Sequence, residues 1–222
     1  GVRRIAGALH GFETLGLLAL LFVVFSLLSD RFFTAQNLQN VALVQAVTAT
    51  LTIAVLMPLI IGEFDLSVGY LVGFAAMSEA VVAQFVQNPV VIILTGPVVG
   101  LIVGFLNGLL TVKLGISSFI ATLGMGILLS GATQGISNGQ VIFENIPAEL
   151  TALAVPSLLG LSSAIWLTLL VALILFYVLE YTPFGRRLYA IGGSERVAYL
   201  AGIRTKRSRI IAFMVAGLLS GV

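Results

Sequence analysis

Long apolar runs, separated by short polar or glycine-rich stretches, cover most of the chain. They lie near residues 11–29, 41–61, 68–86, 90–112, 116–137 and 163–181, and another begins near 210. A helix needs roughly 20 apolar residues to cross a membrane, so we expect about six complete spans and the start of a seventh. The pattern predicts an all-α, multi-pass transmembrane bundle that forms a single domain over residues 1–222.

Composition supports a membrane location and narrows the possible chemistry. Hydrophobic residues make up 59% of the chain and charged residues 9%, whereas a soluble domain carries about 25% charged residues. The chain has no cysteine, and His10 is its single histidine. These counts argue against a thiol nucleophile, a metal cluster and a catalytic triad. We therefore expect no catalytic residues, no bound metal and no nucleic-acid partner.

The basic residues predict the orientation of the bundle. Seven of the eleven fall within 182–209, and Arg3 and Arg4 precede the first span. Basic residues gather in cytoplasmic loops, which predicts a cytoplasmic N-terminus and a cytoplasmic loop at 182–209. The segment 138–162 then lies outside, and its Asn-Gly pair and two prolines predict a loop with a short surface helix.

Glycines recur at intervals of four in the fourth apolar run, at Gly96, Gly100, Gly104 and Gly108. This spacing places them in one stripe along a helix. Helices in lipid associate through small residues that let backbones approach. The stripe predicts a tightly packed helix, either static or sliding against a neighbour during gating.

Two carboxylates interrupt the apolar pattern at residues 62–69. Charges at membrane depth are costly and usually lie at a helix end, in an aqueous cavity or beside a partner. Glu63, Asp65 and Ser67 therefore mark a helix break, with Asp65 as a candidate cap for a helix that starts at Leu66. A purely structural turn and a gate on a translocation path both fit this pattern.

Other polar residues stand alone within apolar runs. Glu79 lies in the third run, and no basic residue lies in the runs to pair with it. Glu79, Asn107 and Thr122 are candidates for lining a pathway. Each is explained equally well by a hydrogen bond between helices.

The cytoplasmic loop predicts a short helix. Ser194 is a candidate N-cap and Gly202 a candidate C-terminal stop. An apolar face on this helix favours a docking site for a cytoplasmic partner over a solvated loop or a surface for anionic lipid. The predicted docking residues run from 194 to 202: Ser194, Glu195, Arg196, Val197, Ala198, Tyr199, Leu200, Ala201 and Gly202.

Three stretches resemble a known family. They run from Gly62 to Gly69, from Asn107 to Gly124, and from Thr182 to Ile203. In order and spacing they are similar to permease subunits of the ribose-type monosaccharide ABC importers, which include xylose, galactose and autoinducer importers. The departures are Glu63 and Phe64 in place of glycine and an aliphatic residue, Tyr70 in place of a small residue, Ser194 in place of asparagine, and Ser117-Ser118 in place of a proline.

The resemblance implies an ATP-driven importer of a monosaccharide or related small polar solute in a bacterial cytoplasmic membrane. It implies a second permease subunit, in a homodimer, and a periplasmic or lipid-anchored binding protein. It also implies separate ATPase subunits that hold ATP and magnesium and dock on residues 194–202. This chain has no G-x-x-x-x-G-K-[ST] loop of its own. Members of the family that the chain resembles continue for about three more spans, so we expect this sequence to be part of a longer chain.

Two other classes remain open from the residues alone. An ion-coupled secondary transporter would use Asp65 and Glu79 as coupling carboxylates, but it leaves the basic 182–209 helix unexplained. A structural membrane subunit without a pathway leaves the polar residues of the spans unexplained.

Overall fold

The computed structural model describes residues 13–152 and 155–222, and this part of the chain is mainly helical. Arg3, Arg4 and His10 lie outside the described residues. The all-α prediction is confirmed. In chain order the elements are α2 (Glu13–Leu28), α3 (Ala35–Ile60), α4 (Val68–Ala83), α5 (Pro89–Val112), α6 (Ser118–Ser137), α7 (Ala148–Ala152), β1 (Pro156–Leu158), β2 (Leu161–Ser162), α8 (Ser163–Tyr181), α9 (Pro183–Gly193), α10 (Glu195–Leu200) and α11 (Thr205–Ser220).

Four of the described helices, α3, α5, α6 and α8, are long and apolar enough to cross a membrane. α4 and most of α2 are apolar but shorter. The α8 helix leaves large apolar side chains such as Leu170, Leu173 and Phe176 more than half exposed, a surface that suits lipid or another membrane helix. The total number of crossings stays a prediction.

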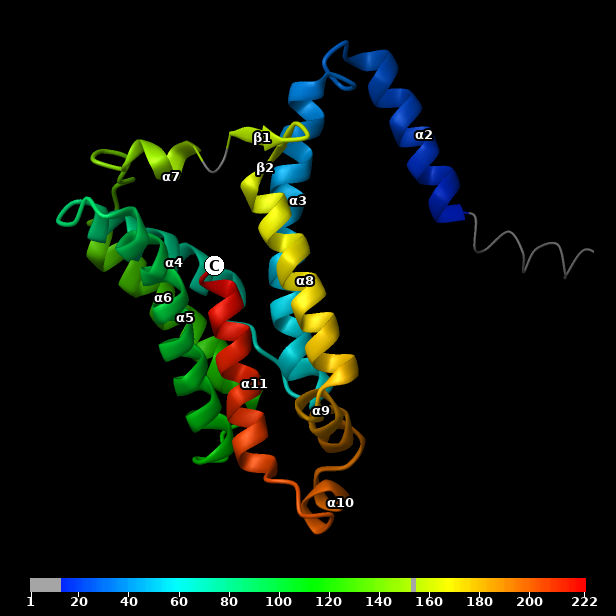
Figure 1. Cartoon of the computed structure of the whole chain (residues 1–222), viewed down its shortest axis with the longest axis vertical. Coiled ribbons are helices and arrows are strands. Elements are labelled where there is room, and N and C mark those ends of the chain that lie inside the picture. The colour runs from blue at the N-terminus through cyan, green and yellow to red at the C-terminus, as the bar shows by residue number, and fades with distance from the viewer. Residues whose placement is uncertain (1–12, 153–154) are drawn as a thin grey trace, which may run out of the picture.

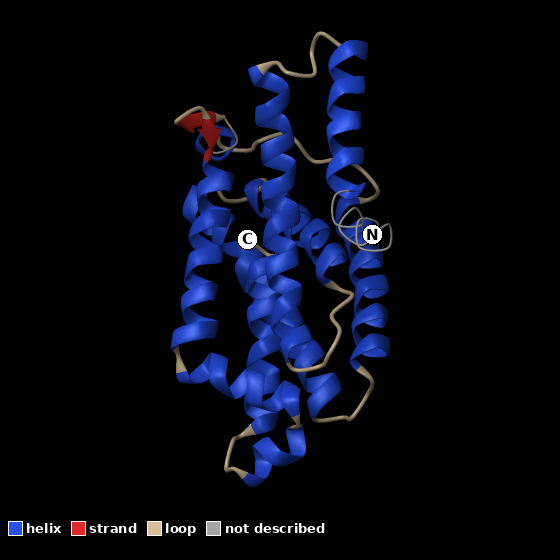
Figure 2. Ribbon diagram, turned by 90° about the vertical axis from the view of Figure 1, so that its right-hand side faces the viewer, coloured by secondary structure: helices blue, strands red, loops and turns tan. Residues whose placement is uncertain are grey.

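The α11 helix lies at the centre of the described bundle (Figure 1). It packs on α5 along one side and on α3 along the other. α4 packs against α5 and α6, and α3 packs against α8. Figures 1 and 2 show α9 and α10 at one end of the molecule and the β1–β2 hairpin at the opposite end.

Several elements differ from the sequence predictions, and α3 begins at Ala35 rather than near 41. The 138–162 segment contains the predicted short helix, α7, but also a hairpin whose turn residues Leu159 and Gly160 both have positive φ. α11 begins at Thr205 rather than near 210. The apolar run starts near 210, but the helix includes the basic residues ahead of it. α4 begins at Val68 rather than Leu66, and the backbone N–H of Leu66 donates to Thr122 Oγ1 on α6.

Candidate functional site

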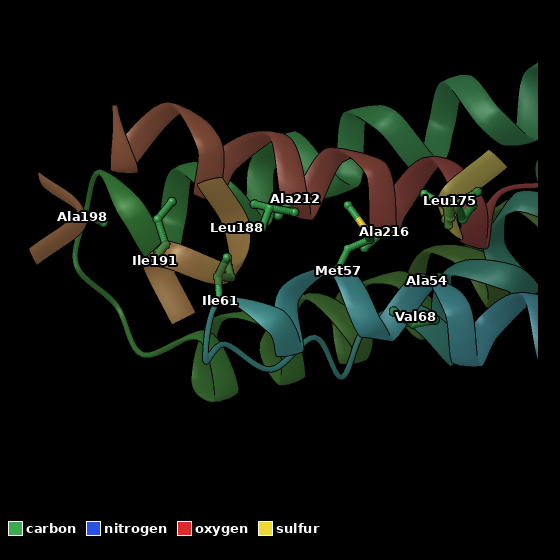
Figure 3. Close-up of a cluster of buried hydrophobic side chains, with 11 residues drawn as sticks. Ala54, Met57, Ile61, Val68, Leu175, Leu188, Ile191, Ala198, Ala212 and Ala216 are labelled. Carbon is green, nitrogen blue, oxygen red and sulfur yellow. The ribbon is translucent and has the colours of Figure 1, made fainter. Parts of the chain in front are cut away.

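A hydrophobic cluster fastens the short helices at one end of the molecule to the long ones. Leu188 and Ile191 of α9 and Ala198 of α10 are buried together with Met57 of α3 and Ala212 of α11. Figure 3 shows these side chains converging from the four elements. Burial of this apolar surface holds α9 and α10 in place against the bundle.

The α10 helix is capped at both ends by residues that sequence reasoning singled out. Ser194 Oγ accepts a hydrogen bond from the Val197 backbone N–H at 3.4 Å. Gly202 has φ +83°, and the backbone N–H groups of Gly202 and Ile203 donate to the carbonyls of Tyr199 and Ala198. This left-handed glycine stop is the common way in which helices end. Six residues make a stable helix here because both ends are satisfied and Ala198 is buried.

The outward face of α10 is apolar and has no partner among the described residues. Val197, Tyr199 and Leu200 are 64%, 69% and 76% exposed, whereas Ala198 is 3% exposed. Exposed apolar side chains that are held on a fixed helix are typical of an interaction site.

The helix break follows a glycine stop at the end of α3. Gly62 has φ +77°. The backbone N–H of Gly62 donates to the Leu59 carbonyl, and that of Glu63 donates to the Pro58 carbonyl. These two bonds satisfy carbonyls that the last turn would otherwise leave unpaired.

Buried polar residues then hold the break against α5. Asp65 Oδ1 accepts from the Ser67 backbone N–H at 3.0 Å and from Ser67 Oγ at 2.6 Å. Asn107 Nδ2, on α5, donates to Ser67 Oγ at 2.8 Å. Asp65 is 5% exposed, and Ser67 and Asn107 are fully buried. Asp65 therefore orders the residues just ahead of α4 and lies two positions before the N-cap residue Ser67. The prediction that Asp65 caps a helix starting at Leu66 is wrong, because the helix starts two residues later.

Hydroxyl groups of α6 hold the same segment from the other side. Ser118 Oγ accepts from the Phe64 backbone N–H at 3.2 Å, and Thr122 Oγ1 accepts from the Leu66 backbone N–H at 3.0 Å. The break is thus a non-helical segment whose backbone groups are satisfied by side chains, as an apolar environment requires. Ser118 was noted in the sequence only as a departure from the family, and its role needed the tertiary contact.

Two buried oxygens close to the break have no hydrogen-bond partner among the described residues. They are Asn107 Oδ1 and Thr111 Oγ1, one turn apart on α5. Thr111 also lines a cavity of about 580 Å³ together with Glu63, Ser118 and Arg209. The break therefore opens onto a space with polar groups on its wall.

Glu79 does not join this network. Its Oε1 accepts a hydrogen bond from the Gly96 backbone N–H at 3.2 Å, and the side chain is only partly buried. Of the three candidate pathway residues, Asn107 and Thr122 lie at the break and Glu79 lies beside the glycine stripe.

The glycine stripe of α5 faces α11. A Cβ atom added at Gly100 would overlap the backbone of Gly217, and one added at Gly104 would overlap the backbone of Phe213. In the reverse direction, a Cβ atom at Gly217 or Gly221 would overlap the backbone of α5. At Gly96 the added atom would overlap both Gly221 and Glu79, and at Gly108 it would press on Ile210. The two helices therefore touch backbone to backbone.

A similar close contact explains one departure from the family. A Cβ atom at Gly126 of α6 would overlap the ring of Tyr70 on α4. The large residue at position 70 is accommodated because α6 carries no side chain opposite it.

Arg209 has a role at the helix break that the sequence did not indicate. Its guanidinium forms ion pairs with Glu195 of α10 and with Glu63 of the helix break. In sequence it was one of seven basic residues in a loop. The contact could not be predicted, since Glu63 lies 146 positions away.

The described residues contain no group of three histidine or acidic side chains that could hold a metal ion.

Comparison with known proteins gives a consistent result. Residues 37–222 match the family described as "Branched-chain amino acid transport system / permease component". The chain is 30% identical over 211 residues to a ribose import permease protein of Haemophilus influenzae, covering 92% of this chain and 64% of that protein. It is 34% identical over 207 residues to an autoinducer 2 import system permease protein of Salmonella typhi, covering 92% of this chain and 59% of that protein. No solved structure matches the chain.

The chain thus spans about three fifths of the length of these relatives. The family match covers most of the sequence and includes both the helix break and the α9–α10 segment. The chain belongs to the branched-chain amino acid transport system permease family.

Proposed function

We propose that this chain forms part of the membrane-spanning subunit of an ATP-driven importer for a monosaccharide or a related small polar solute. The observation that carries the proposal is α10, a capped and anchored helix with three exposed apolar side chains beside a basic surface. The relatives named above are import permeases for ribose and for autoinducer 2.

In this proposal a separate ATPase subunit docks on the exposed face of α10 and supplies ATP and magnesium, since the sequence lacks a phosphate-binding loop. A second permease subunit, in a homodimer, covers part of the apolar surface in the membrane, and lipid covers the rest. A periplasmic or lipid-anchored binding protein delivers the solute at the opposite end. Closure of the ATPase pair moves α10 and changes which side of the membrane the pathway faces.

Crosslinking tests the docking site directly, because the sequence has no native cysteine. Single cysteines at Val197, Tyr199 and Leu200 are expected to crosslink to a co-expressed ATPase subunit. A cysteine at Ala198 is the matched control, since the same helix buries it. Equal crosslinking at all four positions, or none at the three exposed ones, would contradict the proposal.

The alternative, an ion-coupled secondary transporter, needs carboxylates that exchange ions on the pathway. Asp65 is held by Ser67, and Glu79 accepts a hydrogen bond from Gly96. Both carboxylates thus have structural partners, which favours the ATP-driven function.

A further inference from the structure

One guanidinium joins two parts of the chain that the proposed function assigns to different tasks. Arg209 Nη1 lies 2.8 Å and 3.0 Å from the two carboxylate oxygens of Glu195 on α10. Arg209 Nη2 pairs with Glu63, the third residue after the end of α3. The planar guanidinium has separate donors for each carboxylate. It therefore fixes α10 and the start of the helix break relative to each other and to α11.

The ion pair between Arg209 and Glu63 is partly shielded from water. The side chains of Arg209 and Glu63 are 16% and 15% exposed. Shielded charges attract each other more strongly than exposed ones, and removal of one partner leaves the other without compensation. By contrast, Arg204, Lys206 and Arg207 on the neighbouring turn are exposed and form no ion pair within the described residues. Arg209 thus differs from the other basic residues around it.

A second contact links the same two regions. A Cβ atom added at Gly192 of α9 would overlap the Ile60 carbonyl oxygen at the end of α3. Ile61, next in the chain, is buried with Leu188 and Ile191 of α9 (Figure 3). The α9–α10 unit therefore abuts the backbone at the end of α3 and is also tied to Glu63, three residues further along the chain, through Arg209.

The helix break in turn holds α5 and α6. Asn107 bonds to Ser67, and Ser118 and Thr122 accept from backbone groups of residues 64 and 66. A displacement of Glu63 would therefore pass along residues 64–67 to the polar network, and would also change the wall of the cavity beside it. No other ion pair among the described residues connects the docking helix with this network.

We propose that Arg209 is a positioning residue that transmits movement of α10 to the helix break through its paired contacts with Glu195 and Glu63. The inference rests on the proposed function, because an ATPase must move α10 for the link to matter.

Pulsed EPR distances test the link in the complete permease assembled with its ATPase subunits. One spin-label pair, at Arg196 and Leu173, reports movement of α10 relative to α8. The other, at Phe64 and Leu173, reports movement of the break; all three labelled positions are exposed. Each distance is measured without nucleotide and with ATP plus vanadate.

In the unsubstituted complex we expect both distances to shift with nucleotide. In Glu63→Gln and Arg209→Gln we expect the α10 shift to remain and the break shift to be lost, while ATP hydrolysis continues. The double variant should lose no more of the break shift than either single variant, because the two residues act through one contact. Arg207→Gln is the matched control and should retain both shifts.

A break shift of unchanged size in Glu63→Gln would overturn the inference while leaving the proposed function intact. Glu63→Gln also decides the matter if Arg209→Gln fails to accumulate, since Arg209 then keeps its contact with Glu195. If the ATPase does not assemble, or the α10 distance does not respond to nucleotide in the unsubstituted complex, the proposed function fails and the inference with it.

Discussion

The α11 helix is held by two very different contacts along its length. From Phe213 to Gly221 it meets α5 backbone to backbone, with glycines on both helices and no charged residue of either helix in the contact. At its basic end Arg209 reaches two carboxylates on other elements through a long side chain. Close packing without side chains leaves little freedom for rearrangement, whereas a flexible charged side chain can follow its partners over several ångströms.

The difference suggests a division of labour along one helix. The glycine contact makes α5 and α11 one rigid unit, and the charged end connects that unit to α10 and to the helix break. The close backbone contact of the four α5 glycines supports static packing, and the choice between static packing and sliding stays a prediction.

The largest effect is expected from breaking the glycine contact. Gly100→Leu should destabilise the protein by about 3 kcal/mol or more, because the added side chain overlaps the backbone of Gly217, which cannot move away as a side chain could. Thermal unfolding in detergent and the amount of folded protein in membranes measure this effect.

Gly131→Leu on α6 is the matched control, since nothing lies within 4 Å of a Cβ atom at that glycine. It should remain close to the parent protein. Similar losses in both variants would show that the α5–α11 contact has no special role.

A smaller effect is expected at the helix break. Asp65→Ala removes the acceptor for the Ser67 backbone N–H and for Ser67 Oγ, which should cost about 2 kcal/mol. Asp65→Asn keeps one acceptor oxygen and should cost less. Thermal unfolding and uptake assays should rank the parent above Asp65→Asn, and Asp65→Asn above Asp65→Ala.

Asp30→Ala, which changes an exposed carboxylate, should have no effect. If all three variants matched the parent in both assays, the carboxylate would not fix the break.

The smallest effect is expected at Glu79, where the charge itself is not needed. Glu79→Gln keeps an oxygen that can accept from the Gly96 N–H, so transport should stay close to the parent rate. Glu79→Leu, which removes the acceptor, should lower thermal stability by about 1 kcal/mol. Complete loss of transport in Glu79→Gln, with normal amounts of protein, would instead favour ion coupling.

The parts of the structure that depend on neighbours in sequence could be predicted. Apolar runs indicated the long helices, and Ser194 and Gly202 indicated both ends of α10, because caps form with residues three or four positions away. The β1–β2 hairpin was missed because its turn, Leu159-Gly160, lacks the usual Asn-Gly signal.

Contacts between distant residues could not be predicted in the same way. The four-residue glycine spacing indicated a close contact but not its partner, α11. Asp65 was expected to cap a helix that starts at Leu66, but α4 starts at Val68 and Asp65 holds Ser67 ahead of it. The hydroxyl groups of Ser118 and Thr122, which hold the same segment, lie on another helix. Arg209 carried only a charge in the sequence, and its two partners were brought to it by the fold.

The most direct test of the proposed function is uptake of labelled ribose and other monosaccharides by vesicles that contain the complete permease, its ATPase subunits and its binding protein. We predict uptake that requires ATP on the α10 side of the membrane and persists when ionophores collapse the ion gradients. Uptake that continues without ATP and stops with the ionophore would contradict the account.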